Sequence, residues 1–166
     1  MVTIKLPEGD GSERERLWSL HPELGAAADH FNDVVQNGSI LSVPEQEAAR
    51  ARVAHINGCE PCSTARVLDM GSHGLDESFY ADVDDPARRG RYSRRERLAI
   101  EFAERFAAGK DAFDESFWTE LQDAFADKEI FDLAMSVAKW LALGRINAVF
   151  DLAVACPIVI RPRVAA

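Results

Sequence analysis

The sequence predicts a single all-α domain, and three observations support this prediction. The chain has 166 residues, which is the length of one ordinary domain with one core. Its hydrophobic residues recur at intervals near 3.6 residues, and apolar and polar residues do not alternate over any sustained run before the C-terminal tail. Its composition, 47% hydrophobic and 28% charged, is typical of globular proteins. We therefore expect one domain over 1–166, with a helical core at about 20–150 and an extended tail at 156–166.

Four elements are expected in the first half of the chain. Helices are predicted at 22–37 and 44–57, because Pro is favoured in a first helical turn and an Asn-Gly pair closes each stretch. A third helix should begin at the cysteines and continue to Gly71 or Gly74. A short helix followed by a polar loop should fill 75–92, which divides the chain into two helical halves.

Three helices are expected in the second half. Ser93 and Glu96 match a capping box, in which each side chain accepts a bond from an otherwise unpaired backbone N–H, so a helix should follow. Asp114 should cap a short helix, and Asp127 should cap the longest one. Gly144 lies inside this longest helix, where a glycine most often marks a close helix crossing.

The charge of the chain argues against two classes of partner. Nineteen Lys and Arg against twenty-eight Asp and Glu give a net charge of −9, which repels nucleic-acid phosphates and anionic lipid surfaces. The longest apolar run, 152–160, is too short to cross a membrane and contains Pro157. The first residues lack the basic and apolar regions of a secretory signal. We therefore expect a cytoplasmic protein with neither nucleic acid nor membrane as partner.

Cys59 and Cys62 form a C-E-P-C motif at the expected start of a helix. The unpaired N–H groups there stabilise a thiolate, and two cysteines one turn apart can cycle between dithiol and disulfide. A zinc site is an alternative, but it needs four ligands, and Cys156 and scattered histidines are all that the chain adds. Two inert buried cysteines are a second alternative. Redox chemistry is the interpretation that the spacing favours, with no metal.

Glu47 lies on the preceding helix, where its neighbours one and two turns on are Ala51 and Ala54. A carboxylate on such an apolar face is desolvated, which raises its pKa and lets it accept a proton from a thiol near neutral pH. The alternative is a first-turn Glu that complements the helix dipole and stays in solvent.

These residues resemble a known family. Glu47, eleven intervening residues, and the pair Cys59 and Cys62 after Asn57-Gly58 are similar to the alkylhydroperoxidase-D-like branch of the carboxymuconolactone decarboxylase superfamily. The resemblance covers about 20–150, although only the Glu-CxxC core is specific. It implies a helical bundle that assembles as a homo-oligomer, either a dimer, a trimer or a hexamer.

The resemblance also implies roles for individual residues. Cys62 would attack the peroxide, Cys59 would resolve the resulting sulfenic acid, and Glu47 would be the base. The family's relay histidine, four residues after the second cysteine, is Arg66 here. Arg66 would share a helix face with Cys62 and could stabilise a thiolate, but it cannot release a proton at physiological pH. The alternative for Arg66 is a solvated surface charge. His55, which precedes the Asn-Gly break, could approach the cysteines instead, although a partly buried histidine with a structural partner is the alternative.

The function we expect is that of a thiol-dependent oxidoreductase. It would reduce a peroxide through a dithiol–disulfide cycle of Cys59 and Cys62, with a small or protein dithiol as reductant and no cofactor. A lyase acting on a small lactone, as in the namesake branch of the superfamily, is one alternative. A non-catalytic oligomer that senses redox state or scaffolds a partner is another.

Overall fold

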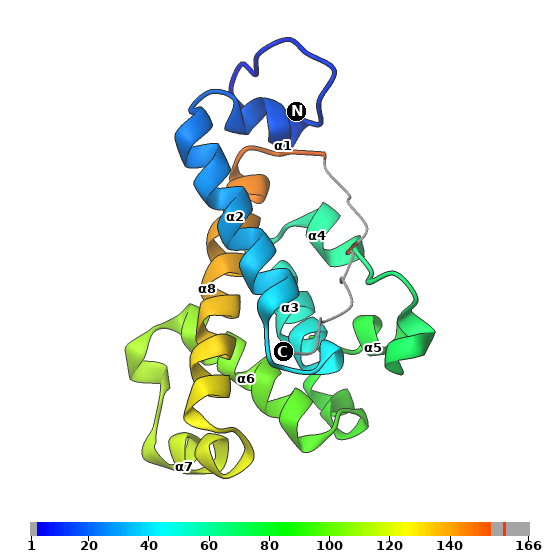
Figure 1. The fold of residues 1–166 in the computed structure, drawn as a ribbon. Helices are drawn as coiled ribbons and strands as arrows, with labels where there is room; N and C mark the ends of the chain where they lie inside the picture. Colours follow the sequence, from blue (N-terminus) through cyan, green and yellow to red (C-terminus); the bar gives the residue numbers. More distant parts are fainter. Residues whose placement is uncertain (1–2, 154–157, 159–166) are drawn as a thin grey trace.

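The computed structural model describes residues 3–153 and residue 158, and in these residues it contains helices and no strand (Figure 1). This confirms the all-α prediction. The α-helices are α1 (Glu13–Trp18), α2 (Pro22–Gly38), α3 (Val43–Asn57), α4 (Glu60–Thr64), α5 (Glu77–Ala81), α6 (Arg94–Ala108), α7 (Glu115–Ala124) and α8 (Asp127–Val149). Short 3₁₀ turns occur at η1 (Met70–His73), η2 (Pro86–Arg91) and η3 (Lys110–Ala112). No helix in the described part of the chain is long and apolar enough to cross a membrane.

Helix α3 is the centre of the fold. It packs against α6 and α8, while α2 runs beside α8 and α4 follows directly from the end of α3 (Figure 1). From Glu45 to Ala54 every residue of α3 except Arg52 is buried, including four that carry a charge or an amide. The main apolar core surrounds this helix. Its members include Leu41, Val53, Leu98, Phe102, Phe117, Leu121, Leu133 and Val137. We therefore expect the polar side chains of α3 to form hydrogen bonds or ion pairs with other groups inside the protein.

Most of the predicted helix boundaries are confirmed. Ser42 and Ser93 form capping boxes at α3 and α6, and Asp114 accepts the Phe117 N–H at the start of α7. The prediction that Asp127 caps the longest helix is wrong. Ala126 is the N-cap of α8, and its N–H donates to the Glu129 carboxylate, so that Asp127 already lies in the first turn.

The predicted helix from the cysteines to Gly71 or Gly74 is also wrong. Helix α4 ends at Thr64, and Ala65 is extended. The chain then pairs with a distant residue, because Leu68 N–H donates to Ile158 C=O and Ile158 N–H donates to Arg66 C=O, each at 3.0 Å. Residues that give their backbone groups to this parallel bridge cannot also form helical bonds. The rest of the predicted tail, including Cys156, lies outside the described residues.

Helix α1 was not predicted, although its capping box is present in the sequence. Ser12 accepts the Glu15 N–H, and the Glu15 carboxylate accepts the Ser12 N–H. The helix packs on α2 at Gly25, where a Cβ atom would lie 2.6 Å from the Cβ of Trp18. This close approach needs a glycine, because a larger residue would separate the two helices.

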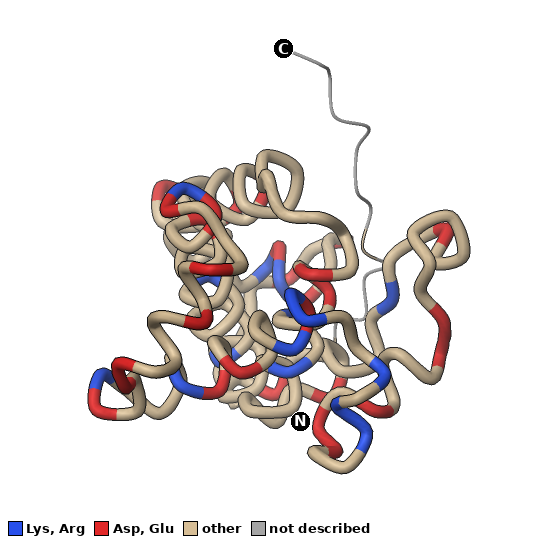
Figure 2. The backbone as a smooth tube through the Cα atoms, turned by 90° about the horizontal axis from the view of Figure 1, so that it is seen from below, with Lys and Arg blue, Asp and Glu red and all other residues tan. Residues whose placement is uncertain are grey.

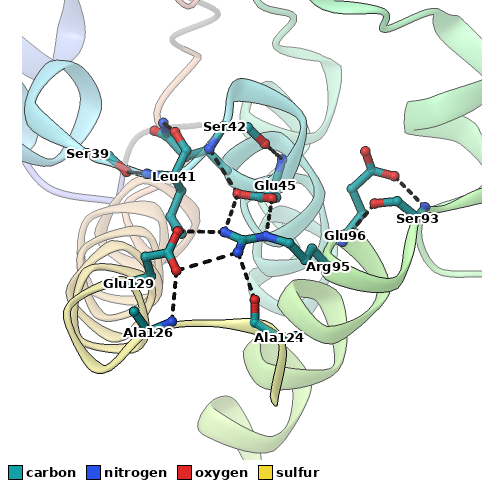
Figure 3. A network of polar contacts seen from close by, with 11 residues as sticks. Ser39, Leu41, Ser42, Glu45, Ser93, Arg95, Glu96, Ala124, Ala126 and Glu129 are labelled. Carbon is teal, nitrogen blue, oxygen red and sulfur yellow. Dashed lines mark hydrogen bonds and ion pairs between the residues drawn. The ribbon is translucent and has the colours of Figure 1, made fainter. Parts of the chain in front are cut away.

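Arg95 connects the N-terminal ends of α3 and α8 to α6 (Figure 3). Its guanidinium forms ion pairs with Glu45 at 2.6 Å and Glu129 at 2.8 Å, donates to Ala124 C=O at 2.8 Å, and lies 4.0 Å from the centre of the Phe125 ring. A guanidinium with this many acceptors fixes the relative positions of three helix ends. The packing of α3 against α8, where the candidate site lies, is held in place from this end.

Candidate active site

The two cysteines form a disulfide at the break between α3 and α4. Gly58 ends α3 in the left-handed conformation, with φ of 62°, and its N–H donates to the last carbonyls of the helix. This turn makes Cys59 the N-cap of α4 and places Cys62 three residues on, with 5.2 Å between the Cα atoms. The structure confirms the predicted pairing. Cys59 is 2% exposed, whereas Cys62 is partly exposed and lines a cavity, so Cys62 is the more accessible sulfur.

Glu47 is buried in the middle of the protein and has two side-chain partners. Its side chain is 1% exposed. Oε1 accepts from Arg50 Nε at 2.8 Å, and Oε2 accepts from the Tyr80 hydroxyl at 2.9 Å. The alternative of a solvent-exposed first-turn Glu is therefore wrong. Burial, and then the charge of Glu47, raise the pKa of Tyr80 above its ordinary value, so this hydroxyl stays protonated and remains a donor.

Arg50 connects this carboxylate to the cysteine motif. Its Nη1 donates to Cys62 C=O at 2.7 Å, and its Nη2 donates to Ala65 C=O at 3.1 Å. The side chain is 7% exposed, so its cation acts in an environment of low polarity. Arg50 was not among the residues predicted from the sequence. Its position one turn after Glu47, on a helix with an apolar face, is the signal that would have indicated a buried ion pair.

A cavity of about 140 Å³ lies beside Cys62, between α2, α3, α4 and α8. Residues in its wall that could act on a ligand include Arg50, Asn57, Cys62, Lys139, Trp140 and Asn147. Two of them have buried polar atoms without a partner in the described part of the chain, namely Trp140 Nε1 and Asn147 Oδ1. Such atoms are rare in folded proteins, and here they can bond to a water or to a small molecule in the cavity.

Lys139 is the least expected residue of this wall. It is 3% exposed, and its ammonium group donates to Asn32 Oδ1 at 3.2 Å and lies 5.0 Å from the centre of the Trp140 ring. Burial, followed by repulsion from Arg50, lowers the pKa of Lys139 to about 7. A signal was present in the sequence, because Lys139 is the one charged residue between Asp132 and Arg145.

Asn57 and Asn147 bring helix α8 against the cysteine motif. Asn57 Nδ2 donates to Trp140 C=O at 3.0 Å, passing over Gly144, where a Cβ atom would lie 2.8 Å from that nitrogen. The predicted close crossing at Gly144 is confirmed. Asn147 Nδ2 lies 4.0 Å from Cys62 Sγ, a contact that places an amide next to the accessible sulfur.

Arg66 does not lie at the position predicted from the sequence. Because α4 ends at Thr64, Arg66 is not on a helix face shared with Cys62. Its guanidinium forms an ion pair with Glu77 at 3.1 Å, donates to Ser63 C=O at 2.7 Å and lies 4.3 Å from the centre of the Tyr80 ring. It is absent from the wall of the cavity beside Cys62. The geometric basis for a thiolate-stabilising Arg66 is therefore wrong.

His55 has a structural partner instead of a place at the cysteines. Its Nδ1 lies 3.1 Å from Asp84 Oδ2, and its side chain is about one-third exposed. It does not line the cavity. The structure thus brings Cys59, Cys62 and Glu47 together through Arg50, and leaves Arg66 and His55 outside.

Comparisons with known proteins agree with this arrangement at the level of the fold. No protein-family model matches the sequence, and no curated protein does. Several solved structures match, among them three with probability 1.00. An uncharacterized peroxidase-related protein from Silicibacter sp. TM1040 has a TM-score of 0.71 at 18% identity, covering 91% of this chain and 90% of that one.

The other two structures have TM-scores of 0.67. One is a protein of unknown function from Agrobacterium tumefaciens, provisionally assigned to antioxidant defence as an AhpD, with 20% identity over 81% of this chain and 92% of that one. The other is the alkylhydroperoxidase AhpD core of an uncharacterized peroxidase-related protein from Ralstonia eutropha JMP134, with 17% identity over 84% and 75%. At these identities the likeness concerns the architecture, and this chain has the all-α fold of the alkylhydroperoxidase-D-like, peroxidase-related proteins.

Proposed function

We propose that the protein is a thiol-dependent peroxidase that works through Cys59 and Cys62. The observation that carries the proposal is the pairing of a buried Cys59 with an accessible Cys62 at a cavity, next to the buried Glu47–Arg50 ion pair. A disulfide between cysteines of unequal exposure suits a cycle in which one sulfur meets the substrate and the other resolves the product.

The proposed reaction has three steps. The Cys62 thiolate attacks the outer oxygen of the hydroperoxide, forming an S–O bond while the O–O bond breaks, and the departing alkoxide takes a proton to become an alcohol. The Cys59 thiol then condenses with the Cys62 sulfenic acid, forming the disulfide and releasing water. An external dithiol reduces this disulfide by two exchange steps and leaves as its own disulfide.

Arg50 supplies the positive charge that the thiolate needs. It lines the same cavity as Cys62 and bonds to the Cys62 carbonyl, so its guanidinium stabilises a thiolate there electrostatically. Glu47 remains the proposed proton acceptor, as the family resemblance implies. Its carboxylate oxygens each have one side-chain partner and can accept a further hydrogen bond.

The direct test is turnover with a dithiol. Native protein should consume hydroperoxide with dithiothreitol as reductant, and Cys62→Ser should abolish this consumption. Cys156→Ser is the matched control and should retain it, because the cycle needs Cys59 and Cys62 alone. Loss of one thiol pair per chain without turnover would favour redox sensing, and unchanged thiols after peroxide treatment would refute the proposal.

We also propose that the protein acts as a homo-oligomer in the cytoplasm. Helix α8 exposes an apolar stripe of Phe131, Met135, Ala142 and Val149, which lie on one helix face. Phe131 is 67% exposed and Val149 is 61% exposed, which is unusual for such large apolar side chains. A reducing compartment would keep the cysteines available for turnover. Sedimentation of the native protein and of Phe131→Lys tests the assembly, because a monomeric native protein would contradict it.

A further inference from the structure

We propose that the cavity beside Cys62 binds the carboxylate end of a small anionic hydroperoxide, with Lys139 as its counterion. This inference rests on the proposed peroxidase function and names its substrate class. Acidic and basic residues are interspersed over most of the chain (Figure 2), which carries a net charge of −9. The wall of the cavity differs from this pattern, because it contains three cations and no carboxylate among the described residues.

Two of these three cations already have carboxylate partners. Arg50 is paired with Glu47 at 2.8 Å, and Arg14 lies 3.5 Å from Asp29. Lys139 has one hydrogen-bond partner in the described part of the chain, the neutral Asn32, and no carboxylate within ion-pair distance. The cavity therefore has one positive charge left without a counterion.

An ammonium group buried without a counterion is costly for the folded state. A methionine of similar length would pack in the same place without this cost. The lysine is useful there if a ligand brings the missing negative charge. A carboxylate is an anionic group that can supply this charge. The ligand that carries it must be small, because a cavity of about 140 Å³ is smaller than the roughly 300 Å³ or more of sites that hold drug-sized molecules.

The two ends of the cavity differ in chemistry. Lys139 and Trp140 are consecutive residues of α8 at one end of the cavity. Asn147 lies about two turns further along this helix, beside Cys62 Sγ. A rise of 1.5 Å per residue separates these places by about 10 Å along the helix. A short acid with its carboxylate at Lys139 can therefore extend its other end toward Cys62. Among the residues that the structure describes, Trp140 Nε1 and Asn147 Oδ1 have no hydrogen-bond partner, which leaves one donor and one acceptor on these same residues.

The proposed binding depends on pH. The charges of Arg50, Glu47 and Arg14 act on the Lys139 ammonium group, whose pKa is about 7. The guanidinium groups stay charged over the whole physiological range, so loss of the Lys139 proton is the change that removes the attraction for an anion. Affinity for a carboxylate should fall as the pH rises above 7, and it should fall less in Lys139→Arg.

The first experiment uses the full chain with its disulfide intact, so that it does not depend on turnover. Calorimetric titration below pH 7 compares pentanoate with pentanamide, which has a similar shape and no charge. We expect pentanoate to bind about tenfold more tightly or better, the ratio expected for a charge-assisted contact. Lys139→Met should remove this preference. Lys128→Met, which removes the same charge from an exposed position on α8, should keep it.

Equal affinity for acid and amide in native protein would overturn the inference, as would an equal loss of the preference in Lys128→Met.

The second experiment assigns the carboxylate to the substrate. Reduced protein reacts with tert-butyl hydroperoxide or with its analogue in which one methyl group carries a carboxylate. Thiol oxidation should be about tenfold faster with the acid in native protein and equal for both in Lys139→Met. The reduction of the disulfide is measured separately, with dihydrolipoate and with its uncharged analogue dihydrolipoamide as reductants. A preference for the charged compound in this step alone would refute a hydroperoxide ligand. If neither peroxide oxidises the thiols, the proposed function fails while the calorimetry still decides the anion site.

Discussion

Arg50 holds Glu47 and Cys62 in one hydrogen-bonded unit: its Nε lies 2.8 Å from the Glu47 carboxylate and its Nη1 lies 2.7 Å from the Cys62 carbonyl. The unit joins the central helix to the short helix that carries the cysteines, and the side chains of Arg50 and Glu47 in it are almost fully buried. Both the stability of this junction and the ionisation of Cys62 should therefore depend on Arg50.

Replacing Arg50 by Met should raise the pKa of the Cys62 thiol, because the nearby positive charge is lost. It should also destabilise the protein by about 3 kcal/mol or more, because Glu47 is left buried and unpaired. The alkylation rate of Cys62 against pH, measured in a Cys59→Ser background, gives the first quantity, and urea unfolding gives the second. Arg52→Met is the control, because this partly exposed arginine of the same helix pairs with Glu104, and it should leave the thiol pKa unchanged.

The loss of stability in Arg50→Met has a specific cause that a second variant can isolate. If the unpaired carboxylate of Glu47 is responsible, Arg50→Met combined with Glu47→Gln should be more stable than Arg50→Met alone. A double variant that is less stable than either single variant would contradict this explanation.

Changes at Arg66 should have little effect on the chemistry. Its guanidinium contacts Glu77, Ser63 and the Tyr80 ring, and it does not line the cavity. Arg66→His should therefore turn over peroxide at the native rate, and Arg66→Gln should leave the Cys62 pKa unchanged. Steady-state peroxidase assays check both variants. A clear gain in Arg66→His would mean that a relay through this position exists after all.

Lys139 should make the stability of the protein depend on pH. Its pKa is about 7 in the folded protein and near the ordinary value of 10.5 in the unfolded chain, so between these values the unfolded chain binds a proton that the folded protein does not. Stability should then rise with pH across this window. Lys139→Met should be more stable than native protein below pH 7, by at most about 5 kcal/mol, and this gain should disappear as the pH approaches 10.5.

Urea unfolding of the two proteins at several pH values measures this difference, with Lys128→Met as the matched control. A stability gain in Lys139→Met that is the same at every pH would show that the lysine is not desolvated in the folded protein.

Local signals predicted most of the helices correctly. Ser42, Ser93 and Asp114 cap the helices that they were expected to cap, because capping depends on residues three positions apart. The same rule would have found α1 from Ser12 and Glu15. It failed after Thr64, where the backbone pairs with Ile158, a partner more than ninety residues away that no local pattern indicates.

The candidate site was predicted only in part for the same reason. The Glu-CxxC spacing identified three residues that lie close together along the chain. Tyr80 reaches Glu47 from α5, and Lys139 and Asn147 reach the cavity from α8, so their places depend on how the helices pack. Arg66 and His55 were placed by their spacing from the cysteines along the chain. Arg66 lies elsewhere because α4 ends early, and His55 lies elsewhere because it contacts Asp84.

The central claim is that Cys62 is the sulfur that meets the peroxide, and trapping of the sulfenic acid tests it most directly. Reduced Cys59→Ser and Cys62→Ser are each treated with one equivalent of hydroperoxide and a sulfenic-acid reagent, and the labelled residue is located by mass spectrometry. The account predicts that the label appears on Cys62 in Cys59→Ser and that Cys62→Ser stays unlabelled at Cys59, which is buried. Label on Cys59 in Cys62→Ser, at the rate seen for Cys62, would contradict the account.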